Sequence, residues 1–181
     1  LLGKMKRQIK DNAVNHTATK HYINNYGYIP LWVLVKVLSF GIVSELFSIL
    51  KKEDQYDIVE LYDLDVNVFV NYLSSLSNYR NLCAHEDILY NNRTQKSILD
   101  TKYHRLLNIP IMDNEYIYGK NDLFSVVIMM KSMIKKDEFD LFEKEISDLI
   151  DELDNKLKSI EINKILDCMG FPKNWKELKD I

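Results

Sequence analysis

The chain has 181 residues, a length that fits one domain or one domain with an appendage. With 46% hydrophobic and 28% charged residues it is too apolar for a disordered protein, and its longest apolar runs fall well short of the ~20 residues that cross a bilayer. The net charge of −3 argues against a general nucleic-acid coating protein, but residues 1–105 hold 13 Lys and Arg against 11 Asp and Glu, so a polyanion should prefer this part.

The scarcity of turn-forming residues, five Gly and three Pro, favours long helices and predicts an all-α fold. Cys83 and Cys168 lack the spacing of a disulfide framework or a zinc site, which indicates a reducing cytoplasm. The chain has no initiator Met and no signal peptide, so we expect a fragment of a longer protein whose N-terminal region is missing.

In chain order, the first predicted elements are a basic segment that can form a helix and a helix from Thr17 to Tyr28, closed by Gly27 and Pro30. A core helix is expected next, because apolar residues recur at three- and four-residue spacing: Leu31, Val35, Leu38, Ile42, Leu46 and Ile49. A short helix is predicted at residues 54–61.

Asp65 predicts the cap of a longer helix that runs to about His85. The apolar stripe of this helix is expected to contain Phe69, Leu73, Leu76, Arg80 and Cys83. Between residues 90 and 120 the pattern weakens and predicts loops around a short helix at 101–107. Further helices are expected at 121–135, 138–160 and 162–169, followed by a stop at Gly170 and a short terminal helix from Trp175.

Arg80, Asn81 and His85 carry the most chemical information. Internal cleavage of RNA needs a base for the 2′-hydroxyl, a cation for the charge growing on the phosphorus oxygens and a proton for the departing 5′-oxygen. Histidine can act as base or acid at neutral pH, and a guanidinium binds phosphate through two parallel hydrogen bonds. Asn81, four residues before His85, could orient the imidazole or contact the substrate.

Helical geometry separates Arg80 from His85. At about 100° per residue, Arg80 falls in the predicted apolar stripe and His85 projects about 140° away. We therefore expect Arg80 to pair with a buried acid or to line an inner cleft, since an unpartnered buried charge is costly. Two facing copies of the helix would bring Arg80 of one chain near His85 of the other, which favours a homodimer. The alternative is that Arg80 joins two helices through a carboxylate such as Glu45, and that His85 only ends its helix favourably against the dipole.

Several segments together resemble a known family. They are His21-Tyr22, Tyr26, Pro30-Leu31-Trp32, Leu38 to Ser44, Arg80 to His85, Asn92-Arg93 and the tail Met169 to Trp175. In this order they resemble the Abi family of bacterial abortive-infection proteins, over about residues 16–95 and 165–178.

That family resembles the HEPN group of α-helical domains, whose hallmark of Arg, a polar residue, three further residues and His is matched by Arg80, Asn81 and His85. The resemblance implies a HEPN-like helical bundle with additional C-terminal helices. In this scheme residues 1–30 are an N-terminal remnant helix and residues 31–181 the HEPN-like domain with its extension, in one compact unit. It also implies metal-independent RNA cleavage at a dimer cleft, which leaves a 2′,3′-cyclic phosphate and serves defence against phage.

Other polar residues are weighed individually. His16, His21 and His104 lack metal-ligand spacing and are expected to be surface or capping residues, so no metal or cofactor is predicted. The aromatic and basic side chains that follow the motif suit contact with RNA, although they equally suit a solvated surface: Tyr90, Arg93, Lys102 and Arg105. The acidic face of the 138–160 helix, with Glu143, Asp151 and Asp154, is expected to be solvated; its functional alternative is to hold a basic segment.

The leading hypothesis is a cytoplasmic, homodimeric RNA endonuclease with Arg80, Asn81 and His85 at its site. The first alternative is a non-catalytic RNA-binding module that uses Arg80 and His85 for phosphate contact. The second is a structural interaction domain in which an internal acid neutralises Arg80, so that Arg80→Ala would cost ~3 to 5 kcal/mol.

Overall fold

The computed structural model describes residues 1–86 and 88–181 and divides the chain into two units, Leu1–Ile58 and Val59–Ile181. Helices make up nearly all the regular structure of the described residues, beside one two-stranded hairpin. The prediction of an all-α fold is therefore confirmed. The boundary expected at residue 30 falls inside the first unit, between two of its helices, and stays a prediction.

The first unit contains α1 (Leu2–Asn12), α2 (Thr17–Tyr26), α3 (Leu31–Leu34), α4 (Phe40–Ser48) and most of α5 (Lys52–Glu60). His16 caps α2, since its Nδ1 accepts a hydrogen bond of 3.2 Å from the Thr19 amide. Gly27, at φ 72° in the left-handed region, ends α2 as predicted.

The continuous core helix predicted over residues 31–49 is wrong. Ser39 has an extended backbone, and its carbonyl accepts from the Ile42 amide, so α4 starts afresh after it. The two ends of the predicted apolar stripe lie in solvent, with Leu31 58% and Ile49 67% exposed. The break falls in the middle of the predicted helix, where the amides of Lys36 and Val37 bond to carbonyls three residues back and end α3 before Ser39.

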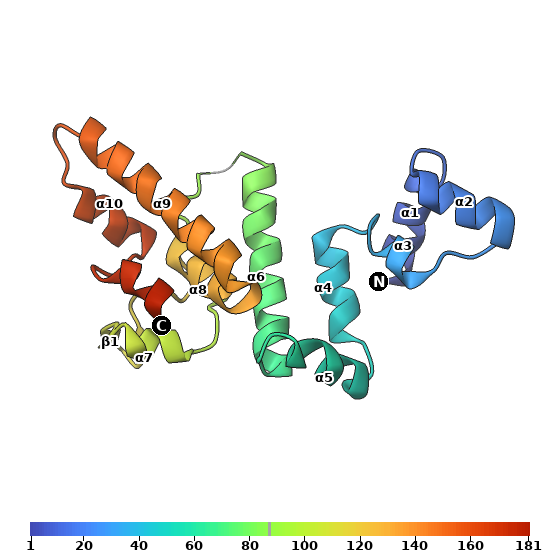
Figure 1. The fold of residues 1–181 in the computed structure, drawn as a ribbon, viewed down its shortest axis with the longest axis horizontal. Coiled ribbons are helices and arrows are strands. Elements are labelled where there is room, and N and C mark those ends of the chain that lie inside the picture. Colours follow the sequence, from blue (N-terminus) through green and yellow to red (C-terminus); the bar gives the residue numbers. More distant parts are fainter. Residues whose placement is uncertain (87) are drawn as a thin grey trace. The chain divides into compact units, whose positions relative to one another are not determined.

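The second unit contains α6 (Val66–Ala84), α7 (Lys102–Leu106), α8 (Leu123–Met133), α9 (Lys136–Lys156), α10 (Ile162–Met169) and the 3-10 helix η1 (Trp175–Asp180). In Figure 1, α9 lies across α8 with α10 beside it, and both α10 and η1 contact α9. Helix α8 is the centre of this core, because Phe124, Ile128 and Met129 are completely buried. No helix of the described residues is both long and apolar enough to cross a membrane.

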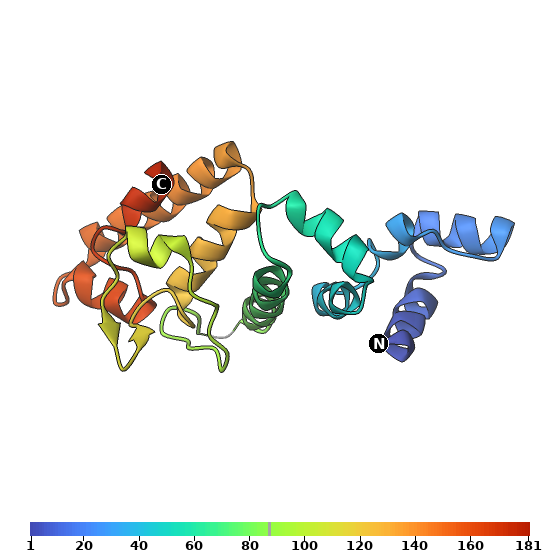
Figure 2. The same ribbon diagram turned by 90° about the horizontal axis from the view of Figure 1, so that it is seen from below.

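A β-hairpin that the sequence analysis assigned to loops lies beside α7, as Figure 2 shows. Its strands, β1 (Ile111–Met112) and β2 (Glu115–Tyr116), are antiparallel. Asp113 and Asn114 form the turn with φ of 52° and 65°, the pair of positive angles that a two-residue type I′ turn requires.

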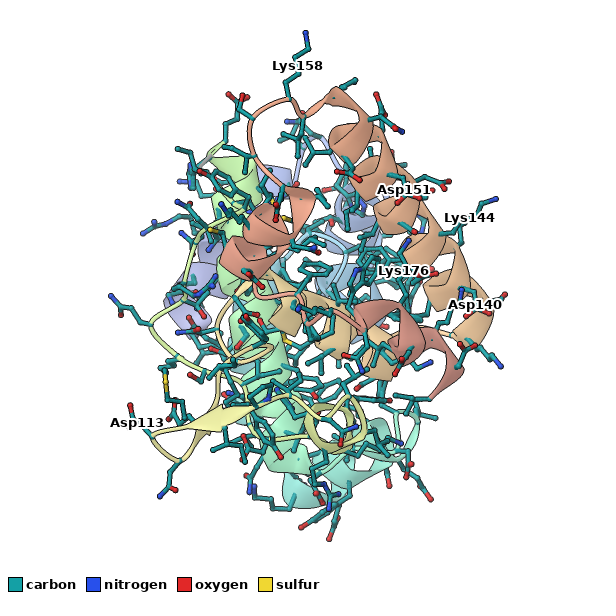
Figure 3. All side chains as sticks on the ribbon, turned by 90° about the vertical axis from the view of Figure 1, so that its left-hand side faces the viewer. Asp113, Asp140, Lys144, Asp151, Lys158 and Lys176 are labelled. Atoms are coloured by element: carbon teal, nitrogen blue, oxygen red, sulfur yellow. The ribbon has the colours of Figure 1, made fainter. Side chains whose placement is uncertain are left out.

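The outer face of α9 is charged, as predicted. Figure 3 shows Asp140, Lys144 and Asp151 projecting from it, with Lys176 of η1 close by; Lys176 Nζ lies 3.7 Å from Asp151 Oδ1. Glu143 is an exception, because its side chain is buried and pairs with Lys179 at 3.8 Å. The expectation that Glu143 belongs to the solvated face is therefore wrong.

The tail folds back onto the start of α8. Gly170 ends α10 at φ 80°, and a Cβ at this position would lie 2.1 Å from Asp122 Cγ, so only glycine fits. Phe171 and Trp175 then enter the core in edge contact, with ring centroids 5.2 Å apart. Phe171 also lies against Phe124 of α8, with ring centroids 5.0 Å apart, and this contact fixes the C-terminal segment against the helix that also supports the candidate site.

Candidate functional site

The predicted motif lies at the C-terminal end of α6, and all three of its side chains are exposed. His85 is the residue that caps α6, with its amide bonded to the carbonyls of the last turn. Arg80 Nη1 donates to Asn81 Oδ1 over 3.3 Å. The guanidinium forms no ion pair with a described carboxylate of its own unit, and in the first unit Glu45 instead pairs with Lys4.

The predicted burial of Arg80 and Cys83 in the apolar stripe of α6 is wrong. The stripe of buried apolar side chains includes Phe69, Tyr72, Leu73 and Tyr79, so it passes through Tyr79 and leaves Arg80 in solvent. The reason lies in distant partners: a tyrosine can occupy a buried position when its hydroxyl finds a hydrogen-bond acceptor, here the carbonyls of Asn121 and Asp122.

Tyr79 is the anchor of this end of α6. Its hydroxyl lies 2.6 Å from the Asp122 carbonyl and 2.9 Å from the Asn121 carbonyl, both at the start of α8, and donates its single proton to one of them at a time. Burial raises the pKa of Tyr79, which keeps the hydroxyl protonated as a donor. The last turns of α6 are thus held against α8.

The loop after α6 is tied to the same point through Thr94. The Thr94 amide donates to the Asn121 carbonyl over 2.8 Å, and the Asn121 side chain donates back to the Thr94 carbonyl over 3.3 Å. The Thr94 hydroxyl also donates to the Lys96 carbonyl over 2.8 Å. Because Tyr79 and Thr94 meet at one carbonyl, residues on either side of Thr94 have a fixed position relative to α6.

Between α6 and this loop lies an open hollow of about 360 Å³. Its lining is polar apart from one leucine and consists of Asn78, Asn81, Leu82, His85, Asn92, Arg93, Thr94 and Gln95. Among these described lining residues there is no carboxylate, so Arg93 gives the hollow a positive charge. The structure therefore brings together three predicted residues, Asn81, His85 and Arg93, whereas Arg80 lies outside the lining.

The other predicted contact residues do not converge on the hollow. Lys102 lines a separate hollow of about 450 Å³ with Tyr62 and Asp65, at the opposite end of α6. For a helix of 19 residues the two ends are about 28 Å apart. Tyr90 is 51% exposed and Arg105 is exposed on α7, and neither lines the hollow of His85.

His104 holds a structural position. Its Nδ1 accepts from the Thr101 amide over 3.1 Å, which completes the capping box of α7, so its Nε2 carries the proton and donates to the Gly119 carbonyl over 3.0 Å. The side chain is fully buried, and this burial lowers the pKa of His104. The prediction that these histidines are surface or capping residues is confirmed, because His16 and His104 cap helices and His21 is exposed and contacts Asn25.

Metal-ligating side chains are dispersed. Over residues 1–86 and 88–181, no three or more His, Cys, Asp or Glu side chains form a group that could hold a metal ion. Cys83 and Cys168 are both exposed free thiols.

Sequence reasoning did not assign to the site five of the lining residues, Asn78, Leu82, Asn92, Thr94 and Gln95, or the support from Tyr79. Asn78 has a sequence signal, because it lies three and seven residues before Asn81 and His85, on the same face of α6. Gln95 has none, since it reaches the hollow through loop geometry. Tyr79 and Thr94 work through hydrogen bonds to residues more than 25 positions away, which no local pattern indicates.

The fold and this site define an α-helical protein with a polar Arg, Asn and His cluster at the end of one helix. The chain belongs to the family of Abi-like proteins, because that family's model matches residues 1–91, half of the chain. The matched segment includes Arg80, Asn81 and His85 and ends before Arg93 and the tail. No curated protein and no solved structure matches the chain.

Proposed function

We propose that this Abi-like protein is a metal-independent RNA endonuclease of the HEPN type that acts as a homodimer in abortive-infection defence in the cytoplasm. One observation carries the proposal: the side chains of Arg80, Asn81 and His85 are all exposed at one helix end, and two of them line a polar, positively charged hollow. A structural role for Arg80 through a buried acid would have required burial.

Each side chain has a chemical task in this proposal. His85 takes the proton of the 2′-hydroxyl, which attacks the adjacent phosphorus and expels the 5′-oxygen. Arg80 stabilises the charge that develops on the phosphorus oxygens. Asn81, hydrogen-bonded to Arg80, positions the guanidinium or the substrate. Arg93 binds a neighbouring phosphate from the other side of the hollow.

In the proposed homodimer, each copy supplies an Arg80 to the His85 of the other. In one chain Arg80 lies outside the hollow that His85 lines, so the two groups do not line one site. Two chains packed through the ends of α6 would place Arg80 of one copy beside His85 of the other. The departing 5′-oxygen takes its proton from solvent, so each pair of Arg80 and His85 is a complete site.

The test is cleavage of a mixed-sequence RNA in the presence of EDTA. Wild type is expected to cut, and His85→Ala is expected to lose at least about 100-fold in rate, the lower range for removing a general base or acid. His21→Ala is the matched control, since His21 is equally exposed but lies on α2. RNA binding without any product in the wild type would select the non-catalytic module, and unchanged cleavage by His85→Ala would remove the assignment.

A further inference from the structure

The hollow beside His85 is rich in carboxamides, which make up four of the eight side chains that the described residues contribute to its lining. Asn78 and Asn81 come from successive turns of α6, and Asn92 and Gln95 come from the facing loop. A carboxamide presents a donor and an acceptor side by side, which is the pattern that the edge of a nucleobase complements. A hollow that bound only phosphate would be expected to present several cationic side chains and not four carboxamides.

Three of these amides have free hydrogen-bonding groups. The side chains of Asn78, Asn92 and Gln95 make no hydrogen bond to any residue within 1–86 and 88–181, whereas Asn81 accepts one from Arg80. Their donors and acceptors are consequently available to a ligand. Arg93 is in part engaged with the Asn92 carbonyl, over 3.3 Å, which directs it along the loop.

The two walls of the hollow are held apart at a fixed separation. Tyr79 connects the α6 wall to the Asn121 carbonyl, and Thr94 connects the loop wall to the same carbonyl. The amides therefore need little rearrangement to meet a ligand, which lowers the entropic cost of binding. Leu82, partly buried between them, supplies an apolar surface on which the face of a base can lie.

We propose that this hollow binds one nucleobase of the RNA next to the cleaved linkage and makes cleavage base-selective. The inference rests on the proposed nuclease function and adds a specificity site to it. Adenine is the expected base, because Asn and Gln pair with adenine through two hydrogen bonds, whereas cytosine favours a carboxylate that the described lining does not offer. The volume of about 360 Å³ is within the range of small-ligand sites.

The experiment digests a random-sequence RNA pool with wild type, Gln95→Leu, Asn78→Leu and the control Asn91→Leu, and then sequences the fragment ends. Asn91 is an exposed amide of the same loop that does not line the hollow. Wild type and Asn91→Leu are expected to enrich one base about tenfold at a fixed position from the cut, the size of one good base contact. Gln95→Leu and Asn78→Leu are expected to reduce the enrichment to within about twofold while still cutting the pool.

The outcomes separate the two proposals. Cleavage without base preference, or a preference that both variants keep, overturns the base pocket and leaves the nuclease standing. If wild type leaves RNA intact, the nuclease proposal fails, and the pocket is then decided by binding of oligoadenylate and oligouridylate to the same proteins. Tighter binding of oligoadenylate that Gln95→Leu removes supports the pocket, and equal binding of the two oligomers overturns it.

Discussion

Neighbouring residues at the end of α6 have opposite environments. Tyr79 is 4% exposed and its hydroxyl meets two backbone carbonyls, whereas Arg80 lies in solvent and contacts Asn81. A rotation of about 100° along the helix thus separates the side chain that supports the site from the exposed side chain that we propose binds substrate. The supporting role of Tyr79 and the proposed substrate contact of Arg80 can therefore be tested separately.

Arg80→Ala is expected to change the free energy of unfolding by no more than about 0.5 kcal/mol, because it removes an exposed side chain without a buried partner. The same variant should lose RNA cleavage. Urea denaturation measures the first effect and the EDTA-resistant assay the second. A loss of ~3 to 5 kcal/mol would instead indicate a buried ion pair and would contradict the exposed position of Arg80.

Two buried titratable residues share Gly119. Burial raises the pKa of Asp122 to about 6, so this group binds more protons in the folded state and stabilises the protein increasingly as the pH falls through 6. Burial lowers the pKa of His104, so the unfolded state binds more protons below ~6.5 and stability is lost as the pH falls. Between about pH 5 and 6, lowering the pH therefore raises the contribution of Asp122 to the free energy of unfolding and lowers that of His104.

Asp122→Asn is therefore expected to make the protein more sensitive to acid. The variant keeps an oxygen that can cap α8 but removes the group that gains a proton, which leaves the His104 contribution unopposed. The free energy of unfolding should decrease more between pH 7 and pH 5.5 in Asp122→Asn than in wild type. Equal slopes for the two proteins would contradict this account of the buried pair.

Among the elements, the sequence predicts best those helices whose apolar face meets a partner. The caps and spacing of α6, α8, α9 and α10 give helices close to the observed bounds. The predicted 31–49 helix fails in its middle, because the extended backbone at Ser39 separates α3 from α4 although the apolar spacing continues through it. The hairpin at 111–116 was missed because two-residue strands give too short an alternation to detect. Its Asp113-Asn114 turn was the available signal.

Local sequence patterns predict part of the candidate site and miss the part that depends on distant contacts. Asn81 and His85 could be predicted from a local motif, and helical spacing could have added Asn78. The position of Arg80 could not be fixed, because the choice between Tyr79 and Arg80 for the buried stripe depends on carbonyls of Asn121 and Asp122, 42 and 43 positions away.

The connection of α10 to η1 depends on Gly170. Gly170→Ala is expected to cost at least about 2 kcal/mol, because it places a side chain in the left-handed region and drives its Cβ into Asp122. Thermal or urea unfolding measures the loss. Gly3→Ala is the control, since nothing lies within 4 Å of a Cβ there and the substitution should be neutral or stabilising. A Gly170→Ala protein as stable as wild type would contradict the close approach to Asp122.

For the whole molecule, the family match and the charge distribution indicate the same part of the chain. Residues 1–91 carry the match to Abi-like proteins and include the end of α6, and residues 1–105 hold the excess of basic over acidic residues. Helix α9 carries nine acidic against three basic residues. It packs against α8, at the start of which Asn121 and Asp122 support the site.

The proposed shared site makes a prediction about mixed dimers. Arg80→Ala and His85→Ala are each expected to be inactive, but an equal mixture, allowed to exchange subunits, should recover about a quarter of the wild-type rate. Half of the dimers would be mixed, and each would contain one intact pair of Arg80 and His85 from different chains. No recovery in a mixture whose exchange is verified would place both groups of each site in one chain.

The chemistry of the RNA ends tests the central claim most directly. In EDTA, the fragments made by wild type are expected to carry 5′-hydroxyl and 2′,3′-cyclic phosphate ends, identified by mass spectrometry, and His85→Ala is expected to make none. Fragments with 5′-phosphate ends, or the same fragments from wild type and His85→Ala, would contradict attack by the 2′-hydroxyl at a site built on His85.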